Sequence, residues 1–410
     1  MKVLIISQYF WPEIFSINEV ATTLLNKGVV VEVLTGKPNY PKGVKFSGYK
    51  SWGCQQEEYR GIPVNRIPML ARGKNAVSLT ANYLSFVLSG LIFAPWMVRG
   101  KKNDVILVYA PSPILQAIPA IFLGKIKGCP VVLWVQDLWP ESLSATGYIR
   151  NRIAIDMVRQ IVRFIYRHVD LLLVQSRGFE APVRALASET PIIYYPNSVD
   201  NAFANPDQVQ PPAVAGLKEG FAVMFAGNIG TAQAVNVIVE AALLLREHTD
   251  INFVVLGEGS CRQEMQDAVQ QYGLTNLNLP GFFPVDTMPA FMQKASVLLV
   301  TLADRPIFAA TVPNKIQAYL AAARPIIACL NGEGARVVVE AGAGMATPAE
   351  DGKALADTIL RLYRLSPDER NKMGENGRRY YQEHFDHDHL VSKLIEHFQT
   401  ILQKGQKGNT

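Results

Sequence analysis

Two uncharged, β-rich runs of apolar residues give the two halves of the chain the same pattern. The first covers residues 3–7, and the second covers 222–226, about halfway along the 410 residues. Each run stops at small or polar residues and is followed by apolar positions at helical spacing, which is typical of the first strand of a doubly wound α/β domain. The sequence therefore predicts two Rossmann-like α/β domains, each built on a mainly parallel sheet.

The same alternation of strand and helix patterns continues through both halves. Strands are predicted at 3–7, 29–35, 64–67, 104–108, 131–135, 171–174 and 192–194, with a helix near 18–27 and a long irregular stretch that ends near 61. In the second half, strands are predicted at 222–226, 252–256, 277–279, 297–300, 326–328 and 344–346. Helices are predicted near 235–246, 262–272, 287–294, 314–323 and 352–365, and one polar helical segment at 376–403.

A polar, proline-rich stretch at 201–220 is the best boundary between the two halves. We expect an N-terminal domain at 1–200, a linker at 201–220, a C-terminal domain at 221–375, and C-terminal helices at 376–410 that cross back to the first domain. Ligands of open parallel sheets bind beyond the carboxyl ends of the strands, so two facing domains are expected to share one cleft. A group-transfer enzyme that holds a donor and an acceptor fits this arrangement.

Composition and charge narrow the class of protein. The four cysteines, Cys54, Cys129, Cys261 and Cys329, are far apart and lack the spacing of a zinc or disulfide framework, which fits a reducing compartment. The apolar run at 3–6 is too short for a signal peptide, so a cytoplasmic protein is expected. The net charge of +5 is modest, and no nucleic-acid partner is expected.

Two segments raise the question of a membrane. The basic segment 150–167 has Arg152, Arg159, Arg163 and Arg167 on one helical face, with Ile155, Val158, Ile161, Val162 and Ile165 on the other. Such a helix can lie on an anionic membrane or hold a phosphate-bearing acceptor, and an ordinary core helix with a solvated face is the open alternative.

The segment 76–98 has no charged residue and is long enough to span the ~30 Å hydrocarbon layer. A span there would divide a continuous α/β domain, so a buried or membrane-grazing helix is favoured. In that arrangement the candidates for shallow insertion are Phe86, Leu91, Phe93, Trp96 and Met97.

Six motifs in order resemble one enzyme family. They are SQYFWPEIFSINE at 7–19, LTGKPNYPKG at 34–43, WVQDLWPES at 134–142, PNSVD at 196–200, FAGNIGTAQ at 225–233 and VPNKIQAYLAAARP at 312–325. Together they resemble the retaining family 4 glycosyltransferases of the GT-B fold. The subgroup with the greatest similarity is that of bacterial O-antigen and capsule enzymes of the N-acetyl-L-fucosaminyltransferase type. The resemblance extends over essentially the whole chain.

The resemblance implies a nucleotide-sugar donor held mainly by the second domain and no metal or other cofactor. Backbone N–H groups, a helix N-terminus and basic side chains would stabilise the diphosphate leaving group. The loop at 227–230 could also be a plain tight turn, and Lys315 could point to solvent. The implied donor-binding residues are Gly227, Asn228, Gly230, Gln233, Glu258, Phe282, Arg305, Thr311, Pro313, Asn314 and Lys315, with Asn314 as a possible helix cap.

The donor side departs from the family pattern at several positions. Asn228 and Gln233 stand where many relatives have an Arg and a Lys, and Ala310 and Ala318 stand where most have a pair of glutamates. Alanine cannot accept a hydrogen bond from a sugar hydroxyl, which favours a 6-deoxy or N-acetylated donor sugar. Ala323 replaces the glycine before Arg-Pro, which we expect to be a minor change.

The first domain is implied to hold the acceptor, a polyprenyl-diphosphate-linked saccharide at the membrane surface. Asp137 and Gln136 end a predicted central strand, and the carboxylate of Asp137 could stabilise an oxocarbenium-like transition state or orient the acceptor. A helix cap is the other interpretation of Asp137. Relatives tend to have Arg at the position of Ser16. The acceptor-side candidates are Glu13, Ser16, Asn18, Tyr40 and Lys42, with Glu19 beside them.

Three functional classes remain open from the sequence. A membrane-associated glycosyltransferase accounts for the two domains, the order of the motifs, the basic helix and the charge-free segment. A nucleotide-sugar epimerase of the same architecture accounts only for the domains and the motifs. A non-catalytic nucleotide-sugar binding protein would account for the missing charges of the donor side.

Overall fold

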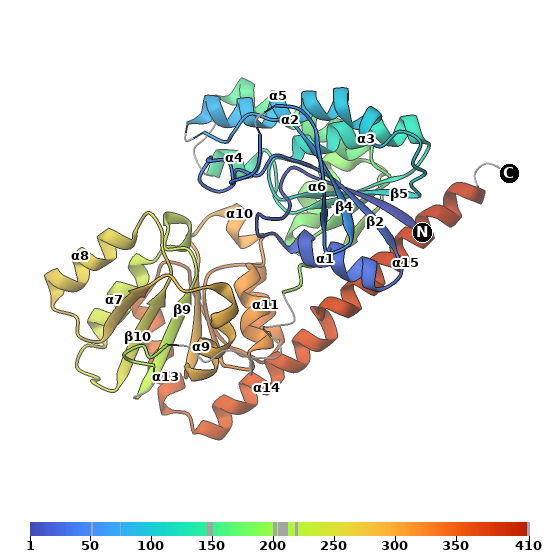
Figure 1. Cartoon of the computed structure of the whole chain (residues 1–410). Helices are drawn as coiled ribbons and strands as arrows, with labels where there is room; N and C mark the ends of the chain where they lie inside the picture. The colour runs from blue at the N-terminus through green and yellow to red at the C-terminus, as the bar shows by residue number, and fades with distance from the viewer. Residues whose placement is uncertain are drawn as a thin grey trace. The chain divides into compact units, whose positions relative to one another are not determined.

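The chain forms two compact units in the computed structural model (Figure 1). Unit 1 is Met1–Pro196 with Asp388–Thr410, and unit 2 is Asn197–His387. The structure describes the chain except for residues 51, 74, 146–150, 200–202, 204–211, 218–219 and 408–410. Most of the predicted linker at 201–220 therefore lies outside the described residues, as does Arg150 at the start of the predicted basic helix.

Unit 1 contains an eight-stranded sheet in the order β3-β4-β2-β1-β5-β6-β7-β8. All neighbouring strands are parallel except β3 and β4, and Ile5 of the central strand β1 is in register with Val33 on one side and Leu107 on the other. The strands are β1 (Lys2–Ser7), β2 (Val30–Gly36), β3 (Gln55–Tyr59), β4 (Ile62–Ile67), β5 (Val105–Ala110), β6 (Val131–Val135), β7 (Leu171–Val174) and β8 (Ile192–Tyr194).

Strand β3 corrects the prediction of an irregular stretch up to residue 61. It pairs antiparallel with β4 and is joined to it by Arg60 and Gly61, both at positive φ (48° and 83°). Two successive residues at positive φ are typical of the tight turn that matches the twist of a hairpin. The strand was missed because its sequence, QQEEY, is polar, as suits the exposed edge of a sheet.

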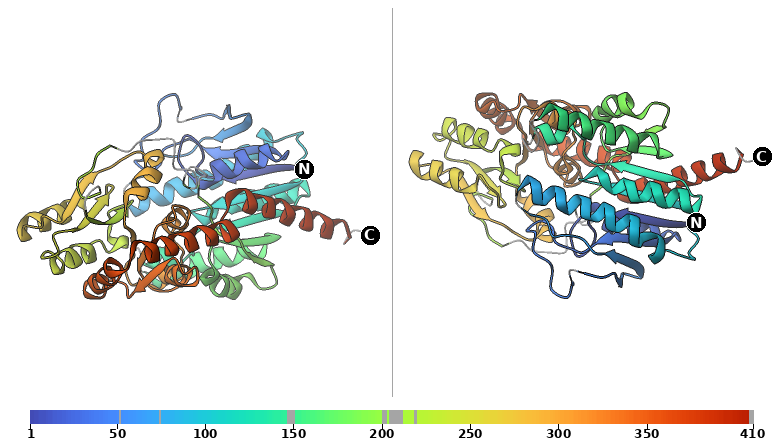
Figure 2. Two further views of the ribbon diagram at one scale, coloured as in Figure 1. Left: turned by 90° about the horizontal axis from the view of Figure 1, so that it is seen from below. Right: turned by 90° about the horizontal axis from the view of Figure 1, so that it is seen from above.

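Both faces of this sheet are covered by helices (Figure 2). Helices α1 (Ser16–Asn26) and α15 (His387–Lys407) pack on one face, where Leu24 and Phe398 share a core with Val3 and Ile5. Helix α3 (Ala117–Lys127) packs on the other face and contacts α2 (Ala76–Met97) on one side and α5 (Arg152–Arg167) on the other. The short helices α4 (Glu141–Ala145) and α6 (Glu180–Ala187) complete the unit.

Helix α2 is long and apolar enough to cross a membrane by length and composition, and a third of its most apolar window is buried in unit 1. Its buried Asn82 accepts a hydrogen bond from Gln8 Nε2 (2.9 Å) and donates to the Leu70 carbonyl (2.6 Å). The candidates for shallow insertion were partly wrong, because Phe86 and Met97 are buried. Leu91 and Phe93 are half-buried, and Trp96 is exposed.

The apolar residues that α2 exposes recur at intervals of seven and four, which is one helical face. We call this face the outer stripe of α2, and its members are Val77, Leu84, Leu88, Ile92 and Trp96. On α5, Val162 and Ile165 of the predicted apolar face are buried, whereas Ile161 of the same face is exposed. Ile153, Met157 and Phe164 of α5 are exposed as well.

Unit 2 contains a six-stranded, fully parallel sheet in the order β11-β10-β9-β12-β13-β14. The strands are β9 (Phe221–Ala226), β10 (Ile251–Leu256), β11 (Leu277–Gly281), β12 (Val297–Thr301), β13 (Ile326–Cys329) and β14 (Gly344–Thr347). The helices are α7 (Asn236–Leu244), α8 (Arg262–Tyr272), α9 (Met288–Lys294), α10 (Pro306–Ala309), α11 (Asn314–Ala321), α12 (Glu333–Glu340), α13 (Gly352–Arg364) and α14 (Pro367–His384).

The end of the chain differs from the single helix predicted at 376–403. Helix α14 starts earlier, because Ser366 and Glu369 form a reciprocal capping box and Pro367 occupies the first helical position. The chain leaves the helix at Phe385 and begins α15 at His387. Helices α10 and α12 were not predicted, and both lie near the donor-side residues of unit 2 described below.

Candidate active site

The loop after β9 is shaped by Gly227. Its φ is +135°, and a Cβ on this residue would lie 2.5 Å from Cε and 2.9 Å from Nζ of Lys315. Gly257, at φ +141°, has even less space, since a Cβ there would lie 1.9 Å from the Gly227 carbonyl oxygen. Glycine is therefore required at both positions, by the backbone conformation and by the space.

Backbone hydrogen bonds tie the loops at the carboxyl ends of β9, β10 and β11 together. The Gly227 N–H donates to Leu256 O (2.9 Å), the Ile229 N–H to Glu258 O (2.8 Å), and the Gly257 N–H to Gly281 O (2.8 Å). Between these ties, the N–H groups of Asn228 and Gly230 have no hydrogen-bond partner within the described part of the chain. Free amides in a fixed loop are suited to binding an anion.

Lys315 extends from the first turn of α11 onto this loop. Its Nζ lies 3.6 Å from the centroid of the Phe225 ring, is buried, and has no hydrogen-bond partner among the described residues. Burial lowers the pKa of the Lys315 ammonium from 10.5 to about 7. A buried cation without an anion is costly, so a bound anion at this place would stabilise both the charge and the loop. Lys315 does not point to solvent.

Asn228 and Gln233, which stand where the resemblance implies an Arg and a Lys, form a neutral pair. Asn228 Nδ2 donates to Gln233 Oε1 (2.9 Å), and Thr301 Oγ1 donates to the Gln233 carbonyl. Gly230 lies against the same amide, because a Cβ there would be 2.6 Å from Asn228 Nδ2. These two residues therefore shape the loop without adding charge, and Lys315 brings positive charge to it from another element.

Two donor-side predictions lie on the neighbouring strand ends. The side chain of Glu258, after β10, is 58% exposed and lies 3.5 Å from Arg262 Nε. Arg262 also donates to Gly257 O (3.2 Å) and Leu279 O (3.0 Å), so it holds the two loops in place. Phe282, after β11, is exposed. An exposed carboxylate and an exposed ring next to the free amides suit a ribose and a base.

The remaining donor-side residues have mainly structural contacts. Asn314 does not cap α11, since the cap position is Pro313, which has no side chain for the role. The Asn314 side chain accepts a hydrogen bond from Asn197 Nδ2 (3.0 Å) instead. Thr311 Oγ1 donates to Ile307 O (2.8 Å), and the exposed Arg305 donates to Asp304 O (3.0 Å).

The structure also offers a carboxylate that the sequence analysis missed. A Cβ on Gly332 would lie 2.0 Å from the Ala309 carbonyl oxygen, so the start of α12 abuts the end of α10. This contact brings Glu333 to the segment that contains Ala310, one of the two positions where the resemblance implies a glutamate. Glu333 pairs with Arg336 (2.9 Å). Because α12 was not predicted, nothing in the sequence pattern marked Glu333.

A pocket of about 220 Å³ lies at the carboxyl ends of the strands of unit 1. Tyr9 follows β1, Tyr40 follows β2, Asp137 follows β6, and Tyr83 comes from α2. The Tyr9 ring stacks on Phe15 (5.4 Å between centroids) and lies 5.2 Å from Tyr40. We call this the tyrosine pocket; its lining is Tyr9, Phe15, Tyr40, Arg72, Leu79, Tyr83, Pro111, Ser112, Asp137, Ser142 and Leu143.

Asp137 is the predicted catalytic residue, and it lines the tyrosine pocket. Its Oδ2 accepts hydrogen bonds from Ser142 Oγ (3.0 Å) and Trp139 Nε1 (3.3 Å). Burial raises the pKa of the Asp137 carboxyl from 3.8 to about 6, against the effect of these hydrogen bonds. Gln136 continues the pairing of β6 with β5, since its N–H donates to Ala110 O (3.2 Å).

The other acceptor-side predictions divide into supporting and exposed residues. Glu13 is buried and accepts hydrogen bonds from the N–H groups of Phe10 (3.3 Å), Asn39 (2.7 Å) and Tyr40 (2.7 Å), and burial raises its pKa. Asn18 donates to Glu13 O (2.7 Å), which fixes the same loop. Lys42 is exposed.

Ser16, at the start of α1, hydrogen-bonds to the buried Tyr109. Of the acceptor-side set, Tyr40 lines the pocket, and Glu13 and Asn18 position the loop that carries it. Sequence reasoning missed Tyr9, Arg72 and Tyr83 as lining residues. Tyr9 lies at a strand end within the first motif and could have been found there, whereas no motif contains Arg72 or Tyr83.

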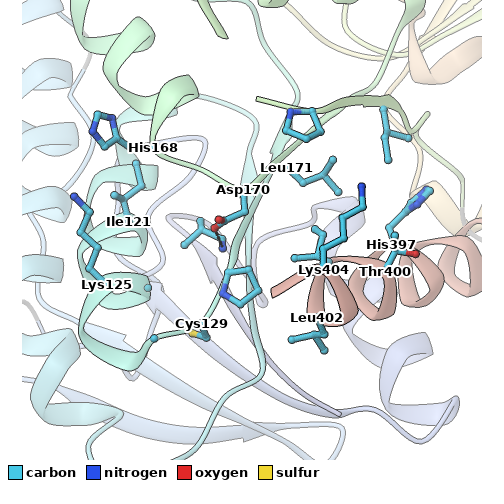
Figure 3. A pocket seen from close by; sticks show the side chains of 17 residues that line it. Ile121, Lys125, Cys129, His168, Asp170, Leu171, His397, Thr400, Leu402 and Lys404 are labelled. Atoms are coloured by element: carbon cyan, nitrogen blue, oxygen red, sulfur yellow. Dashed lines mark hydrogen bonds between the residues drawn. The ribbon is translucent and has the colours of Figure 1, made fainter. Parts of the chain in front are cut away.

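A larger pocket of about 770 Å³ lies at the opposite end of the same sheet (Figure 3). It is lined by Val131 and Leu171, the first residues of β6 and β7, and by His397, Thr400 and Lys404 of α15. None of the predicted site residues lies in it. Because ligands of parallel sheets bind at the carboxyl ends, the smaller tyrosine pocket is the better candidate for substrate binding despite its size.

Two family models match the two halves of the chain in tandem. Residues 16–198 match the Glycosyl transferase 4-like domain, and residues 220–364 match Glycosyl transferases group 1. The chain is 25% identical over 348 residues to "Putative colanic acid biosynthesis glycosyl transferase WcaI" of Escherichia coli K12, covering 78% of this chain and 81% of the relative. It is 27% identical over 322 residues to "Probable glycosyltransferase WbjE" of Pseudomonas aeruginosa, covering 76% of each.

Solved structures with the same architecture match almost the full length. Sucrose-phosphate synthase from Thermosynechococcus elongatus has a TM-score of 0.73 at 16% identity and covers 98% of this chain and 99% of its own. Anabaena Alr3699/HepE in complex with UDP and glucose has a TM-score of 0.66 at 14% identity and covers 98% and 100%. The two parallel-sheet units and these likenesses confirm the predicted GT-B fold.

Proposed function

We propose that this chain, whose two halves match glycosyltransferase domains, moves a sugar from a nucleotide sugar to a lipid-linked saccharide during the synthesis of a bacterial surface polysaccharide. The proposed donor is UDP-linked, with N-acetyl-L-fucosamine as the first sugar to test. Relatives named for colanic acid and O-antigen synthesis support the polysaccharide, and the UDP bound to the structural neighbour Alr3699/HepE supports the nucleotide.

The observation that carries the proposal is the buried ammonium of Lys315 above the glycine loop. It has no ion pair among the described residues, and the free amides of Asn228 and Gly230 belong to the loop that it contacts. A diphosphate would supply the missing negative charge and would accept hydrogen bonds from these amides. A nucleotide sugar presents such a diphosphate, with a ribose and base that Glu258 and Phe282 are suited to bind.

In the proposed reaction, an acceptor hydroxyl oxygen forms a bond to the anomeric carbon of the donor sugar. The bond from that carbon to the diphosphate oxygen breaks, and its electron pair leaves with the nucleoside diphosphate. The hydroxyl proton passes to the departing phosphate, and the anomeric configuration is retained. Lys315 and the loop amides would stabilise the charge that develops on the diphosphate as the bond breaks.

Asp137 has the proposed role of orienting the acceptor hydroxyl in the tyrosine pocket. With a pKa near 6, its carboxylate is mostly ionised at neutral pH and accepts hydrogen bonds from Ser142 and Trp139 on one oxygen, Oδ2. The carboxyl also accepts a hydrogen bond from the Leu138 N–H. A carboxylate has about four acceptor sites, so it retains capacity for one hydrogen bond from the substrate. Carbohydrate rings pack well against aromatic side chains, and the pocket supplies four of them, Tyr9, Phe15, Tyr40 and Tyr83.

The proposed location is the inner surface of the cell membrane. The outer stripe of α2 and the exposed apolar residues of α5 lie on helices of one layer, with α3 between them. Phe122 and Ile126 of α3 are exposed too. Exposed basic residues accompany this face, as expected for contact with anionic lipid. They are Arg99, Lys102, Lys125 and Arg152.

The test is incubation of the purified protein with UDP- and GDP-linked sugars and a polyprenyl-diphosphate-linked N-acetylhexosamine. Extension of the lipid-linked sugar supports the proposal. Interconversion of the nucleotide sugar without extension would indicate an epimerase, and binding without turnover would indicate a binding protein. The anomeric configuration of the product, read by NMR from its coupling constants, tests retention separately.

A further inference from the structure

We propose that Arg72 binds a phosphate of the acceptor, so that the tyrosine pocket recognises a glycosyl phosphate rather than a neutral sugar. The inference rests on the proposed function, because it assigns the pocket to the acceptor. It adds the chemical class that the pocket selects and a binding residue that no sequence motif marks.

The guanidinium of Arg72 is held in the pocket by tyrosines instead of by a carboxylate. Its Nη1 donates to Tyr9 Oη (3.3 Å), and its Cζ lies 5.4 Å from the centroid of the Tyr40 ring. Arg72 forms no ion pair with any residue that the structure describes, although it is half-buried. A guanidinium has five N–H donors in a planar fork, which suits the oxygens of a phosphate.

The backbone on both sides of the guanidinium is fixed. The Arg72 N–H donates to Asn39 Oδ1 (2.8 Å), and Asn39 in turn donates its own N–H to the buried Glu13 (2.7 Å). The neighbouring Gly43 contacts the same residue, because a Cβ there would lie 1.9 Å from Arg72 O. Arg72 is therefore presented by a braced loop, which limits the entropy lost when it binds an anion.

The positive charge of Arg72 and the negative charge of Asp137 favour different parts of a ligand. Asp137 and Arg72 both line the pocket but form no ion pair with each other. An anionic group is repelled by Asp137 and attracted by Arg72, while a hydroxyl is free to approach the carboxylate. This separation orders a glycosyl phosphate with its phosphate toward Arg72 and its sugar hydroxyls toward Asp137.

The position of α2 favours a phosphate over a sugar carboxylate as the source of the negative charge. Leu79 and Tyr83 of α2 line the pocket, and the outer stripe of the same helix exposes apolar residues. A lipid-linked acceptor carries its phosphates between the lipid and the sugar. An acceptor whose lipid lies along the outer side of α2 would thus bring its phosphates to the edge of the pocket.

The experiment measures binding by calorimetry, with saturating UDP present so that phosphate sites of the donor side are occupied. The probes are N-acetylglucosamine 1-phosphate, N-acetylglucosamine and the methyl glycoside of glucuronic acid. The wild type is expected to bind the phosphate at least about 10-fold more tightly than the neutral sugar, a difference of about 1.4 kcal/mol. Arg72→Gln is expected to remove this preference while leaving the affinity for UDP unchanged.

Arg60→Gln is the matched control, because Arg60 also lies over a tyrosine ring, Tyr59 at 5.2 Å, but pairs with Glu19 outside the pocket. It should keep the preference for phosphate. Equal affinity of the wild type for the phosphate and the neutral sugar would overturn the inference, as would an equal loss in both arginine variants. Tighter binding of the glucuronide than of the phosphate would assign Arg72 to a carboxylate and overturn the choice of phosphate.

Binding in this experiment does not depend on turnover, so its failure is distinct from failure of the proposed function. Transfer without any preference for the phosphate would leave the glycosyltransferase proposal intact and remove the role of Arg72. Phosphate binding through Arg72 in a protein that transfers no sugar would support phosphate recognition by Arg72 and contradict the glycosyltransferase proposal. Circular dichroism of each variant shows whether it has folded.

Discussion

The Nζ of Lys315 lies 3.6 Å from the centroid of the Phe225 ring, in space that a side chain at Gly227 would occupy. The ring face attracts the ammonium, but a cation–π contact returns only part of the hydration that burial removes. The arrangement therefore leaves a partly neutralised amine next to free backbone amides. The proposed diphosphate would satisfy all of these groups at once.

Replacing Lys315 by methionine should weaken UDP binding by about 10- to 100-fold, because one charge-assisted contact in a buried site is lost. The affinity for the acceptor should stay the same. Lys353→Met, at an exposed position of α13, is the control and should bind UDP like the wild type. Calorimetric titration with UDP measures the effect. If Lys315→Met weakened donor and acceptor equally, Lys315 would have no specific role toward phosphate.

UDP binding should take up a proton above neutral pH. The pKa of Lys315 is about 7 in the free protein and rises when a diphosphate binds, so at pH 8 a mostly neutral amine becomes charged. Calorimetry in buffers of different ionisation enthalpy should give an uptake of close to one proton at pH 8 and much less at pH 6. Lys315→Met should abolish the uptake at pH 8. An uptake that is the same in the variant would assign the proton to another group.

Asp137 is expected to lower the stability of unit 1 at neutral pH, and a pH series of unfolding measures this effect. Its folded pKa, about 6, lies above the ordinary value of 3.8, so its contribution to stability is fully present below about pH 4 and is lost as the pH rises through 6. Asp137→Asn should therefore be more stable than the wild type at pH 7 by up to about 3 kcal/mol, with little difference at pH 4.

All five tryptophans, at 11, 52, 96, 134 and 139, belong to unit 1, so tryptophan fluorescence during urea unfolding reports on this unit. The gain in stability should come with a large loss of transfer activity, because Asn cannot carry the negative charge that orients the acceptor hydroxyl. A variant with the stability and activity of the wild type at every pH would show that Asp137 is neither buried as described nor part of the site.

The strand pattern of both units could be predicted because parallel strands buried on both faces appear as continuous apolar runs, such as Val131–Val135 and Phe221–Ala226. The edge strand β3 could not, since its residues are polar. For α2, the charge-free run predicted a buried or membrane-grazing helix but not which face would be buried, because the helix is apolar nearly all round. Phe86 and Trp96 were thus indistinguishable in the sequence.

The candidate site was predictable where residues follow strand ends, as Asp137, Gly227 and Glu258 do. Arg72 lies in a loop, and Tyr83 lies on a helix, and their approach to Asp137 depends on tertiary packing. The burial of Lys315 could be suspected from its place after Val-Pro-Asn, but its contact with Phe225 joins residues 90 positions apart in the sequence. No local pattern carries that information.

We expect Ala323 to lower the stability of unit 2, although its replacement of the glycine before Arg-Pro was predicted to be a minor change. It follows α11 with φ +54°, a left-handed conformation that costs an L-residue roughly 1 kcal/mol and that glycine adopts freely. Ala323→Gly should raise the stability of unit 2 by about 0.5–1 kcal/mol. Ala322→Gly is the control, and the opposite result is expected for it. Ala322 is buried with φ −69°, which an L-residue adopts without strain, so this change should lower the stability of unit 2. Differential scanning calorimetry measures both.

The outer stripe of α2 should decide binding to anionic membranes. Leu88→Glu with Ile92→Glu places two charges on the stripe at exposed positions, where they should not disturb the fold of unit 1. Sedimentation with vesicles of phosphatidylglycerol and phosphatidylethanolamine should show binding of the wild type, and a fall of at least about 10-fold in the double variant, since two apolar contacts are lost and repulsion is added.

Leu244→Glu, at an exposed position of α7 in unit 2, is the matched control for added negative charge and should sediment like the wild type. Salt separates the two contributions, because the attraction of Arg99, Lys102 and Arg152 to lipid is screened at high ionic strength, whereas burial of Leu88 and Trp96 is not. Wild-type binding should therefore weaken with salt without vanishing. Binding that salt abolishes completely, and that the double variant retains, would place the contact on the basic residues alone and remove the outer stripe from it.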